Sequence, residues 1–340
     1  GGEILFGFGA SGSGVSTGQT IYPSNVTLNG VVGPDGPDGG GDQSDGNDGS
    51  SPDDTPGGIP DPEPAVPGDG KEQLGLFNYA EAMQKSLFFY DAQRSGDLPD
   101  DFRVSWRGDS AVADGSDVGL DLSGGFYDAG DHVKFGLPGA FSFTLLGWSA
   151  VDQQNSWIQT GQMDELLDLL KWEADFLMRA HVRDAAGDTV EFYGQVGNGG
   201  ADHGFWGPPE LMTMGRPSMK ITRDLPGSDL AAESASTLAV AAMAFAEVDA
   251  VYSAALLEHA EALYRFADMY RDRYMTGIND AWGYYPSSHF MDELVWGALW
   301  LYRATGEESY LAKAEGDFAA HLESGFQSED PSSGYPWTLV

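Results

Sequence analysis

Apolar side chains recur at helical spacing through most of the sequence after residue 75. Tyr79, Met83, Leu87 and Tyr90 fall on one face of a predicted helix. The same period predicts further helices at about 138–152, 163–181, 229–247, 252–271, 292–304 and 307–322. The sequence after residue 75 has no region of sustained strand alternation, so we expect this part of the chain to be all-α.

The segments between the predicted helices are alternately short and long. The long ones, about 98–136 and 183–228, are rich in Gly, Asp and Trp. Helical hairpins joined in this way gather their long loops on one face, which favours an α/α barrel over a four-helix bundle. The alanine-rich stretch 231–246 predicts a helix packed closely against its neighbours. The sequence ends directly after Tyr335-Pro-Trp337, so we expect the barrel to be incomplete at its C-terminus.

Composition divides the chain into three parts. Residues 1–32 alternate apolar and small polar side chains, as at Ile4 and Phe6, and are expected to be a β remnant too short to form a sheet domain alone. Residues 33–70 are nearly all Gly, Pro, Asp and Ser, which predicts a disordered acidic linker. Residues 71–340 carry the helices and are the main domain.

The formal net charge is −36, from 53 acidic and 17 basic residues. This charge excludes nucleic acid as a partner because phosphates would be repelled. No run of eighteen apolar residues occurs, so no membrane span is expected. An acidic, lysine-poor surface repels itself in dilute buffer, whereas molar salt shortens the screening length to roughly 3 Å. The sequence therefore indicates a protein adapted to high salt. It contains no cysteine, so cysteine usage assigns no compartment.

The segment Gly124–Lys134 holds the strongest candidate chemistry. Asp128 and Asp131 lie three residues apart in a glycine-rich turn, so both carboxylates can project into one space. Two carboxylates that orient and deprotonate a water are the working groups of glycoside hydrolysis. The alternative is a loop in which both aspartates only accept hydrogen bonds from nearby backbone N–H groups.

Several longer motifs resemble glycoside hydrolase family 9, the endoglucanase-type cellulases. They are Phe77–Gly96, Val104–Asp109, Gly124–Phe135, Gln195–Glu210 and Pro226–Glu233. The resemblance runs from about Leu74 to Gly334, and it implies an (α/α)6 barrel that hydrolyses β-1,4-glucan with inversion. Near the N-terminus, Phe6-Gly-Phe8 and Thr27–Gly30 resemble the closing strands of a family 2 carbohydrate-binding module.

The resemblance also implies roles for single residues. Asp131 matches the family's general base, and Asp128 matches the aspartate that helps to hold the attacking water. His203, Trp206 and Tyr284 match substrate-cleft positions, where aromatic rings can stack on the apolar faces of glucose. Tyr127 and Trp106 are instead expected to pack within their loops.

Ser288-His-Phe-Met-Asp-Glu293 resembles the family's calcium motif, and calcium is the only cofactor implied; no organic cofactor is. The implied ligands are Ser288, the carbonyl of His289, Asp292 and Glu293, which are hard oxygen donors of the kind that calcium prefers. A further aspartate of the motif is replaced by Thr338. The alternative is a helix N-terminus that Ser288 and Asp292 cap.

The family's general acid is a glutamate near the end of the catalytic domain, and it would fall beyond Val340. Neither Glu210 nor Glu233 matches it, so neither is assigned that role. We therefore expect residues 71–340 to be the N-terminal portion of a family 9 catalytic domain, from an enzyme that cleaves internal β-1,4-glucosidic bonds.

Two alternatives remain. One is a non-catalytic glucan-binding protein that keeps the cleft and lacks the acid, and the other is an α/α-barrel glycosidase acting on other β-linked oligosaccharides. In each case the expected partner is a β-linked glycan. The protein is expected to be monomeric and, because an insoluble polymer lies outside the cell, secreted.

Overall fold

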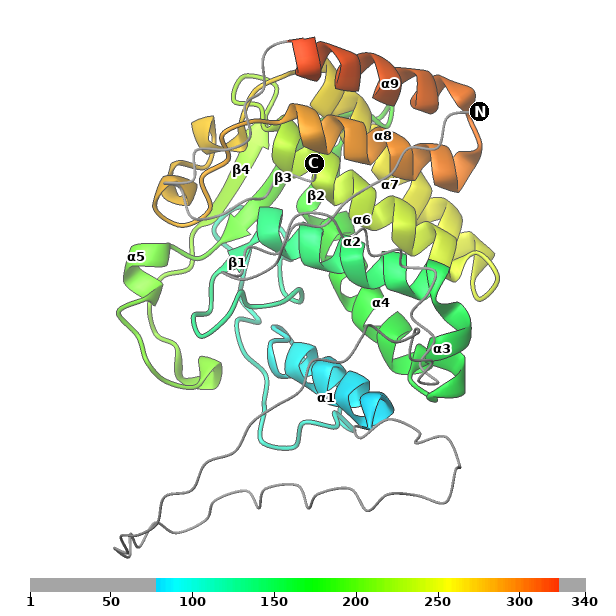
Figure 1. Ribbon diagram of the computed structural model, residues 1–340. Helices are drawn as coiled ribbons and strands as arrows, with labels where there is room; N and C mark the ends of the chain where they lie inside the picture. Colours follow the sequence, from blue (N-terminus) through cyan, green and yellow to red (C-terminus); the bar gives the residue numbers. More distant parts are fainter. Residues whose placement is uncertain (1–77, 324–340) are drawn as a thin grey trace, which may run out of the picture. The chain divides into compact units, whose positions relative to one another are not determined.

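The computed structural model describes residues 78–323, with side chains to residue 320, and these form an all-α scaffold with one small sheet (Figure 1). All seven helices expected from the periodicity are present. They are α1 (Tyr79–Ala92), α2 (Gly136–Asp152), α4 (Met163–Ala180), α6 (Ser228–Phe245), α7 (Ala250–Met269), α8 (Met291–Thr305) and α9 (Glu308–Glu323). Two short helices, α3 (Gln154–Gln159) and α5 (Gly199–Asp202), were not predicted.

Helix α6 is the centre of the core. Nearly all of its residues are buried, and it packs against α2, α7 and α8. Its small side chains allow this close approach, as the alanine-rich sequence predicted. On α2, the position of a Cβ at Gly147 would lie only 2.5 Å from Val240 Cγ1 of α6. On α8, a Cβ added at Gly297 would lie 3.2 Å from the carbonyl oxygen of Ala232 in α6.

Three of these helices run in the same direction. Thr144 of α2 meets Glu233 and Thr237 of α6, and Gly147, further along α2, meets Val240, further along α6. Helices α6 and α8 are also parallel, because Asp229 in the first turn of α6 interacts with Asp292 in the first turn of α8. The N-termini of α2, α6 and α8 therefore lie at the same end, and each is preceded by a long connection.

The prediction that no strands follow residue 75 was wrong. An antiparallel sheet is built on β3 (Thr189–Val196), which pairs with β4 (Ser218–Thr222) and with two shorter strands, β1 (Lys134–Phe135) and β2 (His181–Arg183). Strand β3 is almost wholly buried, so it lacks the alternation of a half-exposed strand. Strand β1 directly follows the two-aspartate turn, so the sheet fixes one end of that turn.

Within residues 78–323, no helix combines the length and the apolar character needed to cross a membrane. The expected β remnant at 1–32, the linker at 33–70 and the last residues, 324–340, lie outside the described residues.

The contact between α2 and α6 gives a stability test. Gly147→Ala should gain up to about 1 kcal/mol of helix propensity. It should nevertheless destabilise the protein by about 1–3 kcal/mol, because the new methyl group overlaps Val240. In a Val240→Ala background the same change should be neutral or stabilising. Urea denaturation of the four proteins in this cycle measures the coupling, and equal effects in both backgrounds would contradict the packing.

Candidate active site

The two aspartates of the glycine-rich turn share one closed loop. The backbone N–H of Asp128 donates to the carbonyl of Val133 (3.0 Å), and Asp131 Oδ2 accepts from the N–H of Val133 (3.2 Å). Before this loop, Gly124 and Gly125 have φ angles of +81° and +69°, which only glycine adopts without strain. The sequence left open that both aspartates only accept hydrogen bonds from nearby backbone N–H groups. Asp131 makes such a bond, whereas the Asp128 carboxylate accepts from the Tyr285 hydroxyl.

The end of helix α1 anchors the entry to the turn. Tyr127 N–H donates to the Gln93 carbonyl (2.8 Å), and Ser95 N–H donates to the Gly125 carbonyl (3.0 Å). The Tyr127 side chain is buried with its hydroxyl on Ser110, as predicted for a loop-packing residue. The same prediction for Trp106 was wrong, because 73% of that residue is exposed.

A buried charge network anchors the exit from the turn. Lys134 pairs with Asp114 (2.8 Å), and Arg216 binds the same carboxylate through two nitrogens (2.7 and 3.1 Å). Arg216 also donates to the carbonyl of His132 (2.7 Å), whose N–H donates to Asp202 Oδ1 (2.8 Å). Both polar groups of the residue after Asp131 are therefore held by buried charged side chains.

Asp128 is the titratable group of the turn with the clearest perturbation. Burial raises its pKa to about 6, the negative charge of Asp131 adds to the rise, and the hydroxyl of Tyr285 opposes it by donating to Asp128 Oδ2. Above about pH 6 Asp128 is ionised and can accept a hydrogen bond from a water. Below that pH Asp128 holds a proton.

The predicted cleft residues gather at this turn. The indole of Trp206, 85% exposed, lies over Gly130, where an added Cβ would be 3.9 Å from the ring. The His203 ring stacks on Tyr284 with centroids 4.8 Å apart, and its Nδ1 lies 2.8 Å from the carbonyl of Gly199. One ligand atom from each of Asp131, His203 and Asp202 lies within 4.8 Å of the others. The predicted catalytic and cleft residues therefore share one site.

Three residues of this site were not predicted. Asp202 directly precedes the predicted His203. Nothing in the sequence distinguished it from the many other aspartates, and only the structure shows that it is 1% exposed. Tyr285 follows the predicted Tyr284, and only the structure distinguishes the ring that contacts Asp128 from the ring that contacts His203. Asp280 is a third addition, because it accepts from Gln195, Asn198 and the Gly199 N–H and so holds helix α5.

Two glutamates that were not assigned as the general acid have structural roles. Glu210 Oε1 accepts from Arg107 Nε (2.8 Å) and from the N–H of Gly108 (2.9 Å). Glu233 is buried in α6, where it accepts from Thr144, and burial raises its pKa to about 8.

The predicted calcium ligands lie at the start of α8. Asp292 Oδ1 and Glu293 Oε2 are buried oxygens without a hydrogen-bond partner, and so is Asp229 Oδ2 from the start of α6. Ser288 is exposed, and the His289 carbonyl accepts from Ser287. Burial and the neighbouring Asp292 raise the pKa of Glu293, and a hard divalent cation would relieve this crowding of buried carboxyl groups.

The alternative of capping by Ser288 and Asp292 is wrong. The N-cap position of α8 is Phe290, and no N-cap side chain accepts a hydrogen bond there. The N–H of Met291 is instead bonded to His289 Nδ1 (3.1 Å).

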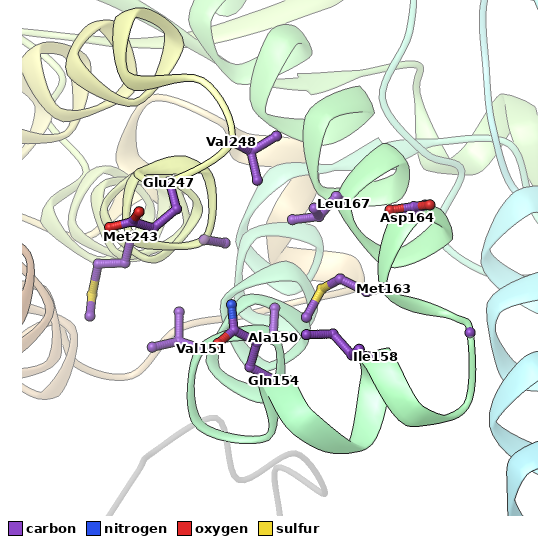
Figure 2. Close-up of a pocket in the computed structure, with 12 residues that line it drawn as sticks. Ala150, Val151, Gln154, Ile158, Met163, Asp164, Leu167, Met243, Glu247 and Val248 are labelled. Atoms are coloured by element: carbon purple, nitrogen blue, oxygen red, sulfur yellow. The ribbon is translucent and has the colours of Figure 1, made fainter.

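A cavity of about 510 Å³ lies away from the aspartate turn (Figure 2). It is lined by residues near the C-terminus of α2, including Ala150 and Val151, and by Met243 and Val248 around the end of α6. The turn precedes the N-terminus of α2, and at 1.5 Å per residue this helix is about 25 Å long. The cavity is therefore separate from the candidate active site.

An all-α scaffold that presents two carboxylates and exposed rings at one turn has the features of an α/α-barrel glycosidase. The chain belongs to glycosyl hydrolase family 9, whose family model matches residues 79–339. It is 52% identical over 272 residues to Endoglucanase B of Cellulomonas fimi, a match that covers 80% of this chain and 25% of that protein.

Solved structures agree with this membership. The endoglucanase of the termite Nasutitermes takasagoensis is 47% identical with a TM-score of 0.70, and the match covers 75% of this chain and 57% of that one. Endoglucanase CelQ of Clostridium thermocellum, complexed with cellotetraose, is 36% identical with a TM-score of 0.60, and the match covers 71% of this chain and 37% of that one. The predicted (α/α)6-barrel fold class is confirmed. The chain spans between a quarter and three fifths of the length of these relatives.

The hydrogen bond between Tyr285 and Asp128 gives a test of the site. Tyr285→Phe removes the donor that favours the ionised carboxylate, so the pKa of Asp128 should rise above about 6. Carboxyl ¹³C NMR of aspartate-labelled protein, assigned with Asp128→Asn, measures the shift. Tyr284→Phe is the matched control, because that ring stacks on His203. An Asp128 pKa that is equal in Tyr285→Phe and the parent protein would contradict the described contact.

Proposed function

We propose that this chain provides the nucleophile-activating half of a β-1,4-glucanase site, which cleaves internal bonds of cellulose-like chains with inversion. The observation that carries the proposal is the arrangement of Asp128 and Asp131 on one anchored turn, with Trp206, His203 and Tyr284 beside them. Family membership supports the substrate class, and CelQ is described in complex with cellotetraose.

Asp131 is the proposed general base. Among residues 78–323, its carboxylate accepts one hydrogen bond, from the N–H of Val133 (3.2 Å), so lone pairs remain to take a proton from water. Asp128 is the second holder of that water, and its raised pKa places its ionisation close to neutral pH. In an inverting site, these groups face the sugar from the side opposite a protonated acid, with carboxyls about 6.5–9.5 Å apart.

From the resemblance to family 9, we propose that the general acid is a glutamate outside residues 78–323. Glu210 and Glu233, which do not match it, make structural hydrogen bonds instead. The exposed Trp206 indole offers a stacking surface for a glucose ring, and His203 Nε2 offers a lone pair to a sugar hydroxyl. We further propose that the protein is secreted, monomeric and adapted to high salt, on the basis of its polymeric substrate and its net charge of −36.

We propose a calcium site at the start of α8. Asp292 and Glu293 would hold the ion with Ser288 and the carbonyl of His289, and Asp229 lies close enough to interact with Asp292. Calcium would supply positive charge to buried oxygens and would tie the connection 286–290 to the two helix starts.

The proposed base is tested with a substrate that needs no acid. A 2,4-dinitrophenyl β-cellotrioside has a leaving group that departs unprotonated, so its hydrolysis reports on the base alone. Asp131→Ala should slow release of dinitrophenolate about 10²–10⁴-fold in molar salt. Asp164→Ala, an exposed aspartate at the start of α4, is the control and should leave the rate unchanged.

The same assay separates the alternatives. NMR of the first product should show the α anomer if the reaction inverts. Binding of cellotetraose without release of dinitrophenolate would favour a glucan-binding protein over an enzyme. Equal rates for Asp131→Ala and the parent protein would reject Asp131 as the base.

Thermal unfolding tests the calcium site. Calcium at about 100 times its dissociation constant should stabilise the folded protein by about 2.7 kcal/mol, seen as a higher Tm. Glu293→Gln should remove this response. Without calcium it should be at least as stable as the parent protein, because burial and the neighbouring Asp292 disfavour an ionised carboxylate at this position and a neutral amide avoids that cost. Glu307→Gln, at an exposed position between α8 and α9, should respond normally. A Tm that is independent of calcium in the parent protein would reject the site.

A further inference from the structure

The donor atoms beside the catalytic turn form a cluster that the proposed hydrolysis does not explain fully. One ligand atom from each of Asp131, Asp202 and His203 lies within 4.8 Å of the other two. Asp131 is half-buried and His203 is exposed, so solutes reach the cluster from the side where glucan is proposed to bind. Two carboxylates and one imidazole suit a zinc-like ion, whereas calcium prefers six to eight oxygens.

Asp202 provides an independent reason to expect a cation here. Its side chain is buried, and its Oδ2 has no hydrogen-bond partner. The nearest cationic nitrogen, Arg216 Nη1, lies 3.6 Å from Oδ2, an ion-pair distance, and its two N–H groups donate to the His132 carbonyl and to Met212 Sδ. Arg216 is also shared with Asp114. A buried, ionised oxygen that lacks a hydrogen bond is costly unless another group satisfies it.

His203 keeps one ring nitrogen available to bind a metal ion. Its Nδ1 lies 2.8 Å from the Gly199 carbonyl, which can only accept, so Nδ1 carries the proton and the Nε2 lone pair is free. Histidines that bind metal ions usually donate their other N–H in this way, because it fixes the tautomer and the ring orientation. Asp280 holds the Gly199 N–H (2.8 Å), so helix α5 is itself fixed.

The local charge favours a cation. Asp128, Asp131, Asp202 and Asp280 all lie at the site, and Asp280 is held by neutral donors from Gln195, Asn198 and Gly199. Among the described residues around Asp202, Arg216 is the cation at ion-pair distance, and it is shared with Asp114, which also pairs with Lys134. Lys134 and Arg216 therefore balance Asp114 and Asp202 and leave the other carboxylates of the site without a cation of their own. A divalent ion would therefore gain favourable interactions from several carboxylates.

We propose that Asp131, Asp202 and His203 form a reversible binding site for a divalent transition-metal ion, which blocks hydrolysis when it is filled. In tetrahedral zinc sites the ligand atoms are about 3.3 Å apart. The cluster must therefore contract, and the exposed His203 side chain is the group that can move. The inhibitory part of this inference rests on the proposed function, because the ion would occupy the lone pairs that Asp131 offers to water. Metal binding itself does not depend on that function.

Cobalt(II) titration in molar NaCl tests the site, since the salt suppresses weak binding to the many surface carboxylates. The parent protein should give the intense visible absorption of a low-coordinate cobalt site. His203→Gln and Asp202→Asn should each weaken binding at least tenfold. His259→Gln, which changes a histidine that contacts His181 outside both proposed metal sites, should not. Absence of this absorption in the parent protein, or equal affinity in His203→Gln, would overturn the proposal.

Kinetics with the dinitrophenyl substrate test inhibition separately. Zinc should inhibit reversibly and in competition with substrate, and a chelator selective for transition metals over calcium should restore the rate. Inhibition in His203→Gln should need at least tenfold more zinc. If cobalt binds through His203 and zinc leaves the rate unchanged, inhibition is rejected. If no hydrolysis occurs even without metal, the proposed function fails, and the cobalt spectrum still decides whether the site exists.

Discussion

The active-site turn depends on a buried network of two positive and two negative side chains. Asp114 joins Lys134 to Arg216, and Arg216 lies between Asp114 and Asp202. Two members of the network hydrogen-bond to the backbone of His132, the residue after the proposed base: Asp202 accepts from its N–H, and Arg216 donates to its carbonyl. Removing one partner of a buried pair typically costs 3–5 kcal/mol, because the other charge is left uncompensated. The position of Asp131 is therefore tied to the stability of the whole region.

The burial of Asp128 raises its pKa, and this costs stability when the carboxyl group is ionised. The pKa of Asp128 is raised to about 6, above its value in an unfolded chain, so the folded state prefers the protonated form. The resulting stabilisation is fully present below the unfolded pKa and is lost as the pH rises through about 6. Above about pH 6 the buried, ionised Asp128 costs stability, which the anchors of the turn at α1 and Arg216 offset.

The helices could be predicted from the sequence because each presents a continuous apolar stripe at a period of 3.6 residues. Strand β3 could not, because it is buried on both faces and interrupted at Gly194, where an added Cβ would lie 2.1 Å from Leu230. Asp128 and Asp131 could be selected because they share one short motif. Asp202 and Tyr285 could not, because their role depends on contacts between segments that lie about 70 and 157 residues apart.

The parallel packing of α2, α6 and α8 explains why the site forms at one end of these helices. Each N-terminus carries unpaired N–H groups and partial positive charge, which favour nearby carboxylates. Asp229 begins α6, Asp292 and Glu293 begin α8, and the two-aspartate turn leads into α2. The small side chains of α6 allow the three helices to approach closely, so these anionic groups collect in one region. Two of the proposals depend on this packing: the base at the turn that leads into α2, and the calcium site at the starts of α6 and α8. The proposed transition-metal site depends in addition on helix α5, which provides Asp202 and is followed by His203.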